Sequence, residues 1–139
     1  MPKTIILAAA LPSRPEKLYD MYLDSESHSA FTGAPATVEP RPGAPFHAFD
    51  GQLTGTMLHI VPKRLIVQAW RSANWHEDAI DSTLVLSFLP EQTEDGGATG
   101  RIELVHVNVP DSDFAGVSRG GEKYYFTPWR AWFEVNSSS

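Results

Sequence analysis

The chain has 139 residues and a formal net charge of −6, with 42% hydrophobic and 20% charged residues. This length fits one domain that can bury a core without disulfides or metal, and the composition is that of a globular protein rather than a disordered or fibrous one. The acidic balance argues against a nucleic-acid binder, because neutralised phosphates supply most of that affinity. The chain contains no cysteine, which excludes a disulfide framework, a thiolate nucleophile and a cysteine zinc site.

The first residues, MPKTIILAAALPS, combine one lysine with an apolar run from Ile5 to Leu11. The run is followed at once by a helix-start signal rather than by a signal-peptide cleavage site, so we interpret it as a first strand. No run reaches the roughly 20 apolar residues with which a helix crosses a membrane. We therefore expect a cytoplasmic protein without a membrane span, and the lack of cysteine fits a reducing compartment.

Two short helices are predicted near the N-terminus. Ser13 and Glu16 have the S-x-x-E spacing of a capping box, which predicts a helix over about 14–24. A second short helix is predicted over 25–31. The glycines and prolines that follow, between residues 33 and 45, break helix repeatedly and turn the chain to extended segments.

Short extended segments separated by turns occupy the middle of the chain. They are PFHAFD from residue 45, TGTMLHIV from 54, RLIVQAW from 64, STLVLSFL from 82 and RIELVHVNV from 101. The short connections predict an antiparallel meander, because parallel strands would need crossover helices. The segment at 91–100 is predicted to be an exposed loop.

A long terminal helix is predicted over 120–134, after a polar link over 111–121. The domain is predicted to be single and to span residues 1–136, with 137–139 as a disordered tail. This order of elements predicts an α+β fold in which a curved antiparallel sheet is covered by the terminal helix, the only long element left to cover it.

Three segments carry a resemblance to a known family. They are V-H-V-N-V-P-D at 105–111, Y-Y-F-x-P-W-x-x-W-F-E at 124–134 and, at 46–75, F-x-x-F-D-G-x-x-T-G-x-x-x-x-I-V-P-x-x-L-I-V-x-x-W-R-x-x-x-W. In this order and at these distances they resemble the family related to the activator of the 90-kDa heat-shock protein ATPase, within the START-like (SRPBCC) superfamily. The resemblance covers residues 3–135.

The resemblance implies a helix-grip fold, also called START-like or Bet v 1-like. In this fold six or seven antiparallel strands wrap a long C-terminal helix and leave a cavity between sheet and helix. Many members have Gly-Trp where this chain has Gly120-Gly121. The resemblance therefore implies a looser helix start or a wider cavity in this chain.

The predicted terminal helix has a ring-rich face. Helical spacing places five rings on it: Tyr125, Phe126, Trp129, Trp132 and Phe133. Pro128 cannot donate to the carbonyl of Tyr124, so a kink or irregular turn is predicted between them. The face can be core or cavity wall, and we predict that Tyr125 and Trp129, on either side of the proline, contribute to the wall.

The strands supply the other candidate ligand contacts. Trp70 is predicted to face the cavity and Trp75 to lie at its mouth, although strand parity leaves the inward face open. His106, on an apolar strand face, is either a hydrogen-bonded core residue or the group that orients a polar ligand. The predicted ligand-binding residues are Phe49, Trp70, Trp75, His106, Tyr125 and Trp129.

Motifs of known catalytic or metal chemistry are not found. The five histidines lack metal-binding spacing, and the sequence has no nucleophile elbow or dinucleotide fingerprint. The G-G-x-x-G at 96–100 lies in an acidic loop that would repel a phosphate. We therefore predict no catalytic residue, no metal and no cofactor.

Three functions stay open, led by a non-enzymatic START-like domain that binds a small hydrophobic or amphipathic molecule. The resemblance implies a second, a co-chaperone that stimulates a 90-kDa-type chaperone ATPase in the stress response, although this chain resembles only the activator's C-terminal part. A third is a cyclase or aromatase-type enzyme, as found elsewhere in the superfamily, with His106 and Tyr125 assisting proton transfer. A homodimer is also expected, because such sheets often leave an apolar patch exposed.

Overall fold

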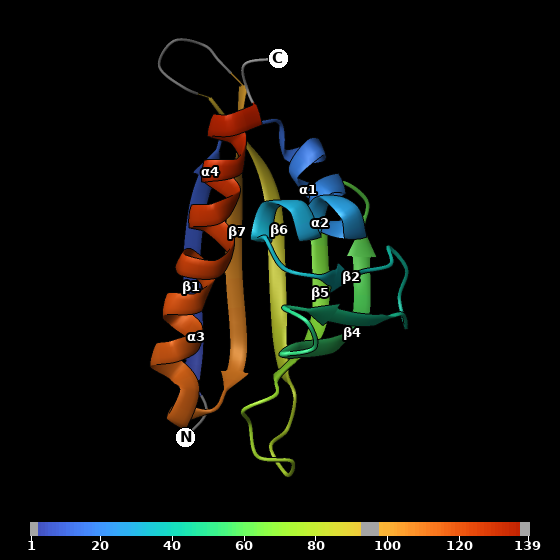
Figure 1. The fold of residues 1–139 in the computed structure, drawn as a ribbon, viewed down its shortest axis with the longest axis vertical. Helices are drawn as coiled ribbons and strands as arrows, with labels where there is room; N and C mark the ends of the chain where they lie inside the picture. Colours follow the sequence, from blue (N-terminus) through green and yellow to red (C-terminus); the bar gives the residue numbers. More distant parts are fainter. Residues whose placement is uncertain (1–2, 93–97, 137–139) are drawn as a thin grey trace.

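The computed structural model describes residues 3–92 and 98–136 (Figure 1). The predicted disordered tail at 137–139 lies outside the described residues. Figure 1 shows a single sheet with the N-terminal helices and the C-terminal helix on the same face of it. No helix within the described ranges is long and apolar enough to cross a membrane.

The sheet has seven antiparallel strands in the order β1-β7-β6-β5-β4-β3-β2. Their bounds are β1 Lys3–Leu11, β2 Ala36–Thr37, β3 Pro45–Ala48, β4 Leu53–Val61, β5 Leu65–Ser72, β6 Ser82–Gln92 and β7 Ala98–Val109. Strands β2 to β7 follow one another as a meander, and β1 adds to the edge of β7. The predicted α+β helix-grip architecture is confirmed, whereas the predicted loop at 91–100 is wrong at both ends because β6 and β7 extend into it.

The two predicted N-terminal helices are present as α1 Pro15–Leu23 and α2 Ser25–Thr32. The predicted capping box is wrong, because Arg14 occupies the N-cap of α1 and no side chain caps it. Pro15 begins the helix instead, since its fixed backbone angle suits the first turn and it has no amide proton to satisfy. Helix α2 is capped by Asp24, whose Oδ2 accepts from the backbone nitrogen of Ser27 at 3.0 Å.

The predicted polar link at 111–121 is also wrong, because it is helical almost throughout. A short 3-10 turn, η1 Asp111–Asp113, leads into α3 Phe114–Gly120. Phe114 and Val117 pack against the core, and this burial outweighs the low helix propensity of two glycines in seven residues. The helical segment therefore starts earlier than predicted.

An irregular turn joins α3 to the last helix, α4 Thr127–Asn136. It is a π-helical segment, η2 Gly121–Phe126, in which the backbone nitrogen of Thr127 donates to the carbonyl of Glu122, five residues earlier. The predicted irregularity is present, but it begins before Tyr124. Because Pro128 supplies no amide proton, the helix has a widened turn just before it. Gly121 therefore lies inside the helical segment and not at its start.

Candidate functional site

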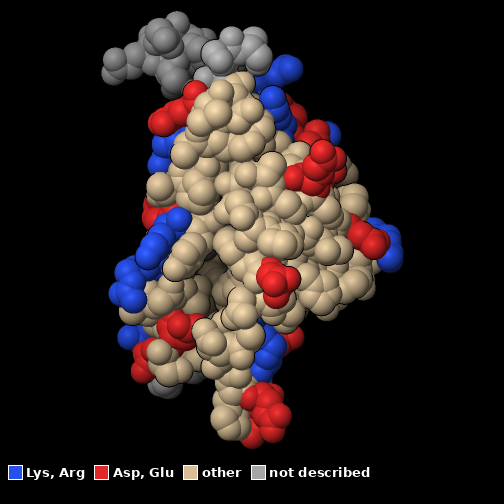
Figure 2. All heavy atoms as spheres, viewed as in Figure 1, with Lys and Arg blue, Asp and Glu red and all other residues tan. Residues whose placement is uncertain are grey.

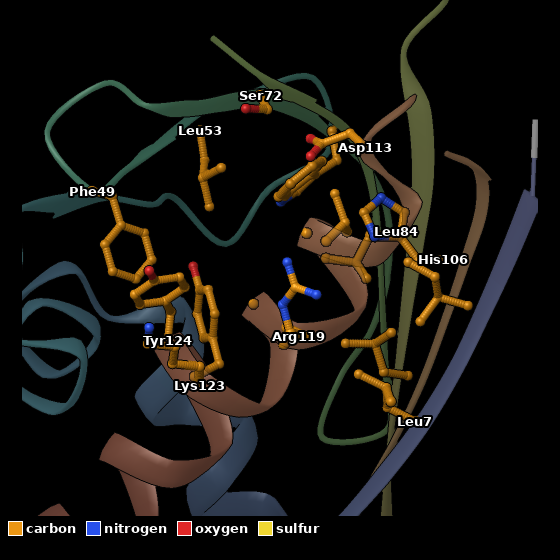
Figure 3. A pocket seen from close by; sticks show the side chains of 18 of the residues that line it. Leu7, Phe49, Leu53, Ser72, Leu84, His106, Asp113, Arg119, Lys123 and Tyr124 are labelled. Atoms are coloured by element: carbon orange, nitrogen blue, oxygen red, sulfur yellow. The ribbon is translucent and has the colours of Figure 1, made fainter. Parts of the chain in front are cut away.

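A half-open cavity of about 550 Å³ lies between the sheet and the α3–η2 segment (Figure 3). On the sheet side it is lined by Ile5, Leu7, Leu53, Trp70, Leu84, Leu104 and His106. On the helix side it is lined by Gly116, Val117, Arg119, Gly120, Gly121, Lys123, Tyr124 and Tyr125. The side chains of the sheet wall are mainly apolar, with Ser72 and His106 as polar exceptions, and the helix side carries two cations at the opening.

Four of the six predicted ligand-binding residues line this cavity: Phe49, Trp70, His106 and Tyr125. They come from the turn after β3, from β5, from β7 and from η2, so only the fold brings them together. Binding of a ligand by these residues stays a prediction.

Trp70 faces the cavity because β5 alternates strictly between buried and partly buried positions. Ile66 and Gln68 share its buried face and are 0% exposed. The alternation of residues along β5 did not show which of its two faces points inward. The structure shows that the face with Trp70 does, because this face meets the helices.

Trp75 and Trp129 lie outside the cavity wall. The Trp75 ring packs edge-on against Trp70, with centroids 5.5 Å apart, and its Nε1 donates to Asp113 Oδ2 at 2.7 Å. Trp129 is 1% exposed and stacks on Phe31 at 4.0 Å with an interplanar angle of 4°. Trp75 thus packs behind Trp70 and Asp113, which line the cavity, whereas Trp129 packs in the core against Phe31.

His106 places a polar group in the apolar wall. Its Nε2 lies 2.7 Å from Ser82 Oγ, and Ser82 Oγ donates its only proton to the carbonyl of Trp70 at 2.8 Å. The serine oxygen therefore accepts from His106 Nε2, and Nδ1 is left as an acceptor. Burial lowers the pKa of His106 to about 4, so the imidazole is neutral at pH 7.

A second polar network fixes the ring of Tyr125. His28 Nδ1 donates to the carbonyl of Tyr22 at 2.9 Å, so its Nε2 accepts from the Tyr125 hydroxyl at 3.0 Å. The Tyr22 hydroxyl in turn donates to Gln68 Oε1 at 2.7 Å. Burial lowers the pKa of His28 to about 4 against a smaller opposing effect of the Tyr22 carbonyl, and it raises the pKa of Tyr125 well above its usual value.

Sequence reasoning missed His28. The residue is 0% exposed and touches the cavity wall only through Tyr125, which is 97 residues away. The one local signal is the helical spacing of His28 and Phe31, whose rings stack at 5.2 Å. That spacing is too common to single out a histidine.

The described residues contain no group of three or more His, Asp or Glu side chains placed to hold a metal ion. Among the described residues, neither buried histidine has a carboxylate as a hydrogen-bond partner. The arrangement offers a mainly apolar chamber with His106 as a neutral acceptor at the wall and basic groups at the opening. The further neutral polar side chains in the lining are Gln52, Ser72 and Asn74. Such a chamber is suited to holding a molecule in a set orientation.

A seven-stranded antiparallel sheet that grips a C-terminal helix around a cavity defines a START-like, helix-grip domain. Within that class, residues 12–134 match the family described as "Activator of Hsp90 ATPase homolog 1-like protein". The chain belongs to this family, as the resemblance of its motifs predicted.

Relatives in the family are similar in sequence over most of this chain. It is 32% identical over 124 residues to "Activator of 90 kDa heat shock protein ATPase homolog 1" of Homo sapiens, covering 88% of this chain and 34% of that protein. The Dictyostelium discoideum homologue is 26% identical over 121 residues, covering 87% of this chain and 30% of that protein. The chain thus spans about a third of the length of these curated relatives.

Solved structures share the fold at lower identity. An HSP90 activator from Plasmodium falciparum superposes with a TM-score of 0.76 at 21% identity, covering 96% of this chain and 95% of that chain. The Aha1 dimer from Colwellia psychrerythraea gives 0.71 at 16% identity, covering 94% and 96%. DynU16, from the dynemicin biosynthetic locus, gives 0.74 at 12% identity, covering 96% and 48%. These likenesses show the fold alone.

Proposed function

We propose that this domain binds a small hydrophobic or amphipathic molecule in the cavity between the sheet and the α3–η2 segment. The observation that carries the proposal is the half-open space of about 550 Å³ itself, since protein interiors are otherwise packed with few voids larger than a water molecule. Ligand pockets are typically about 300–1,000 Å³, mainly apolar, with a few placed polar groups. The lining residues match that description.

The side chains in the cavity support binding more than catalysis. General acid–base groups work best with a pKa close to the working pH, whereas burial lowers the pKa of His106 to about 4. Tyr125 already donates its proton to His28, and burial raises its pKa. The cyclase or aromatase alternative therefore has less support than a binding role.

Filling the cavity from the helix side is expected to weaken binding. A Cβ on Gly121 would meet Leu7 Cδ1 at 2.7 Å, so the indole in Gly121→Trp would project among the lining residues after a small shift of that flexible side chain. We expect the affinity for the neutral fluorophore N-phenyl-1-naphthylamine to fall by about tenfold or more. The fold should persist, because Gly121 has an ordinary helical φ of −58° and glycine is a poor helix former.

The matched control for this variant is Gly120→Ala. A Cβ on Gly120 would meet only Tyr124 Cδ2, at an ordinary 3.6 Å, so probe affinity should change little. Fluorescence titration gives both affinities, and circular dichroism checks the fold. A folded Gly121→Trp protein that binds the probe as tightly as the wild type would show that the cavity is not the binding site.

The similarity to the human activator favours a second candidate function. Because 88% of this chain aligns with that protein at 32% identity, we propose that the domain also docks on a 90-kDa-type chaperone and raises its ATPase rate. The match covers only about a third of the length of these relatives, so stimulation of a chaperone ATPase by this chain alone is a proposal.

The chaperone's steady-state ATPase rate with saturating domain tests this second function. We expect a rate above the basal one, and an unchanged rate would remove the idea. The Gly121→Trp variant belongs in the same assay, because the substituted residue lines the cavity. Stimulation by this variant would separate docking from ligand binding.

A cytoplasmic location and a homodimer also stay proposals for this chain. The homodimer is supported by the dimeric neighbour from Colwellia psychrerythraea and by Ile6, which is 75% exposed on the edge strand β1. Sedimentation at low micromolar concentration measures the oligomeric state directly.

A further inference from the structure

We propose that the cavity selects an amphipathic anion: an apolar body that fills the chamber and a single carboxylate or sulfonate-type group that Arg119 holds at the mouth. This inference rests on the proposed ligand-binding function and names the chemical class of the ligand. Three observations support it. Two cations lie at the opening, these cations form no ion pair with the described residues, and the opposite wall of the cavity is lined mainly by leucines.

Two cations lie at the opening of the cavity. Arg119 on α3 and Lys123 on η2 both line it, and a separation of four residues places them on neighbouring turns of one helical face. Figure 3 shows the Arg119 guanidinium extending from the helix into the space between Tyr124 and the leucines of the sheet. An incoming molecule therefore passes this group.

Neither cation forms an ion pair with the described residues. Within residues 3–92 and 98–136, the ion pairs of lysine and arginine involve Lys3, Arg41, Lys63, Arg71 and Arg101. Arg119 has no hydrogen bond or ion pair to the described residues, and Lys123 makes only a cation–π contact, with its Nζ 5.4 Å from the centroid of the Tyr124 ring. Two unpaired cations thus flank the opening in a chain of net charge −6.

Asp113, the one acidic residue among the described residues that line the cavity, forms no ion pair with either cation. Asp113 Oδ2 accepts the Trp75 indole proton at 2.7 Å, which commits that carboxylate to the wall. Figure 2 shows the hollow beside the helix, with Lys and Arg side chains along its left border and separate acidic side chains below it and to its right. The positive groups are therefore the ones on the helix side of the opening.

The opposite wall decides how an amphipathic molecule would lie. Leu7, Leu84 and Leu104 line that wall, and an anion placed against them would lose its hydration without a partner. The neutral His106 offers only its Nδ1 acceptor there, with no partner among the described residues, so it suits a hydroxyl group and repels an anion. Among the described residues that line the cavity, the positive charges are those of Arg119 and Lys123, so the proposal places the anionic group at Arg119 and the apolar body toward the leucines.

Two probes with the same apolar body test this assignment. 8-Anilinonaphthalene-1-sulfonate is N-phenyl-1-naphthylamine with one added sulfonate, so their affinities differ through the charge. A charge-assisted guanidinium–oxyanion contact predicts that the anionic probe binds about tenfold tighter at neutral pH and low salt. In Arg119→Gln this advantage, measured as the ratio of the two affinities in the same variant, should disappear.

The control is Arg64→Gln, because Arg64 is exposed in the β4–β5 turn and does not line the cavity. This variant should still bind the anionic probe about tenfold tighter than the neutral one. Decanoate and decanol repeat the comparison with a carboxylate. Decanoate should displace the neutral probe at a lower concentration than decanol does. Equal affinities of the two fluorophores for the wild type, or an advantage that persists in Arg119→Gln, would overturn the anion assignment and leave the proposed function standing. Failure of both fluorophores to bind would overturn the two together.

Discussion

Lowering the pH from about 7 to about 5 is expected to reduce the free energy of unfolding by about 4 kcal/mol, because two buried histidines resist protonation in the folded state. His28 is 0% exposed and His106 is 3% exposed. Burial lowers the pKa of each to about 4 from the usual 6.5. Burial keeps both imidazoles neutral, and in each ring the protonated nitrogen donates a hydrogen bond, from His28 to the Tyr22 carbonyl and from His106 to Ser82.

The direction of the effect follows from where each state binds protons. Between pH 6.5 and pH 4 the unfolded chain is protonated at these histidines and the folded protein is not, so stability rises with pH across this window. Full stability is present above pH 6.5 and is lost as the pH falls toward 4. At pH 5 the loss is about 2 kcal/mol for each histidine, set against roughly 5–15 kcal/mol for a whole domain.

Urea unfolding at the two pH values measures the loss. His28→Asn and His106→Gln replace each ring by a neutral amide, and each is expected to remove about half of the histidine-dependent change. His59→Gln, at an exposed position, is the control for replacing an imidazole. Carboxylates are common to all the variants, so an unchanged pH dependence in both buried-site variants would contradict the assignment.

Replacing Trp129 by alanine is expected to cost about 3–5 kcal/mol of stability. Its ring is 1% exposed and lies flat on Phe31 at 4.0 Å, so truncation opens a large void between α2 and α4. Thermal unfolding followed by circular dichroism should show a melting temperature lower by about 10 °C or more. Trp132→Ala, at a partly buried position of the same helix, should cost less and is the matched control.

Trp129→Phe separates packing from hydrogen bonding at this position. The indole Nε1 is buried and has no hydrogen-bond partner among the described residues, and an unpaired buried donor costs roughly 1–3 kcal/mol. Phenylalanine keeps a ring on Phe31 and removes that donor, so we expect a smaller loss than for alanine. A Trp129→Ala protein as stable as the wild type but unable to bind N-phenyl-1-naphthylamine would show instead that Trp129 is a ligand contact.

Errors in the predicted elements have local causes. The helix at Phe114–Gly120 was predicted as a link, because two glycines and few apolar residues give it no helical signal of its own. It forms because Phe114 and Val117 find the core and because the segment continues into η2 and α4. The capping box failed for a related reason, since Pro15 begins the helix without a side-chain cap and places Ser13 outside it.

Periodicity and turn residues were enough to predict the order of strands and helices and the covered antiparallel sheet, because these depend on spacings within short segments. The motifs between 46 and 134 were enough for the family. Which residues line the cavity could not be predicted from these patterns. On one ring-rich helix face, Tyr125 lines the cavity while Trp129 stacks on Phe31 from α2.

Periodicity tells which face of an element is apolar but not what that face meets. A cavity exists where two surfaces from distant parts of the chain fail to fill the space between them. His28 reaches Tyr125 across 97 residues, and Arg119 reaches the opening because a predicted link is helical. The apolar faces could therefore be assigned from the order of the amino acids, whereas the chamber and the charge at its mouth arise only when sheet and helix are packed together.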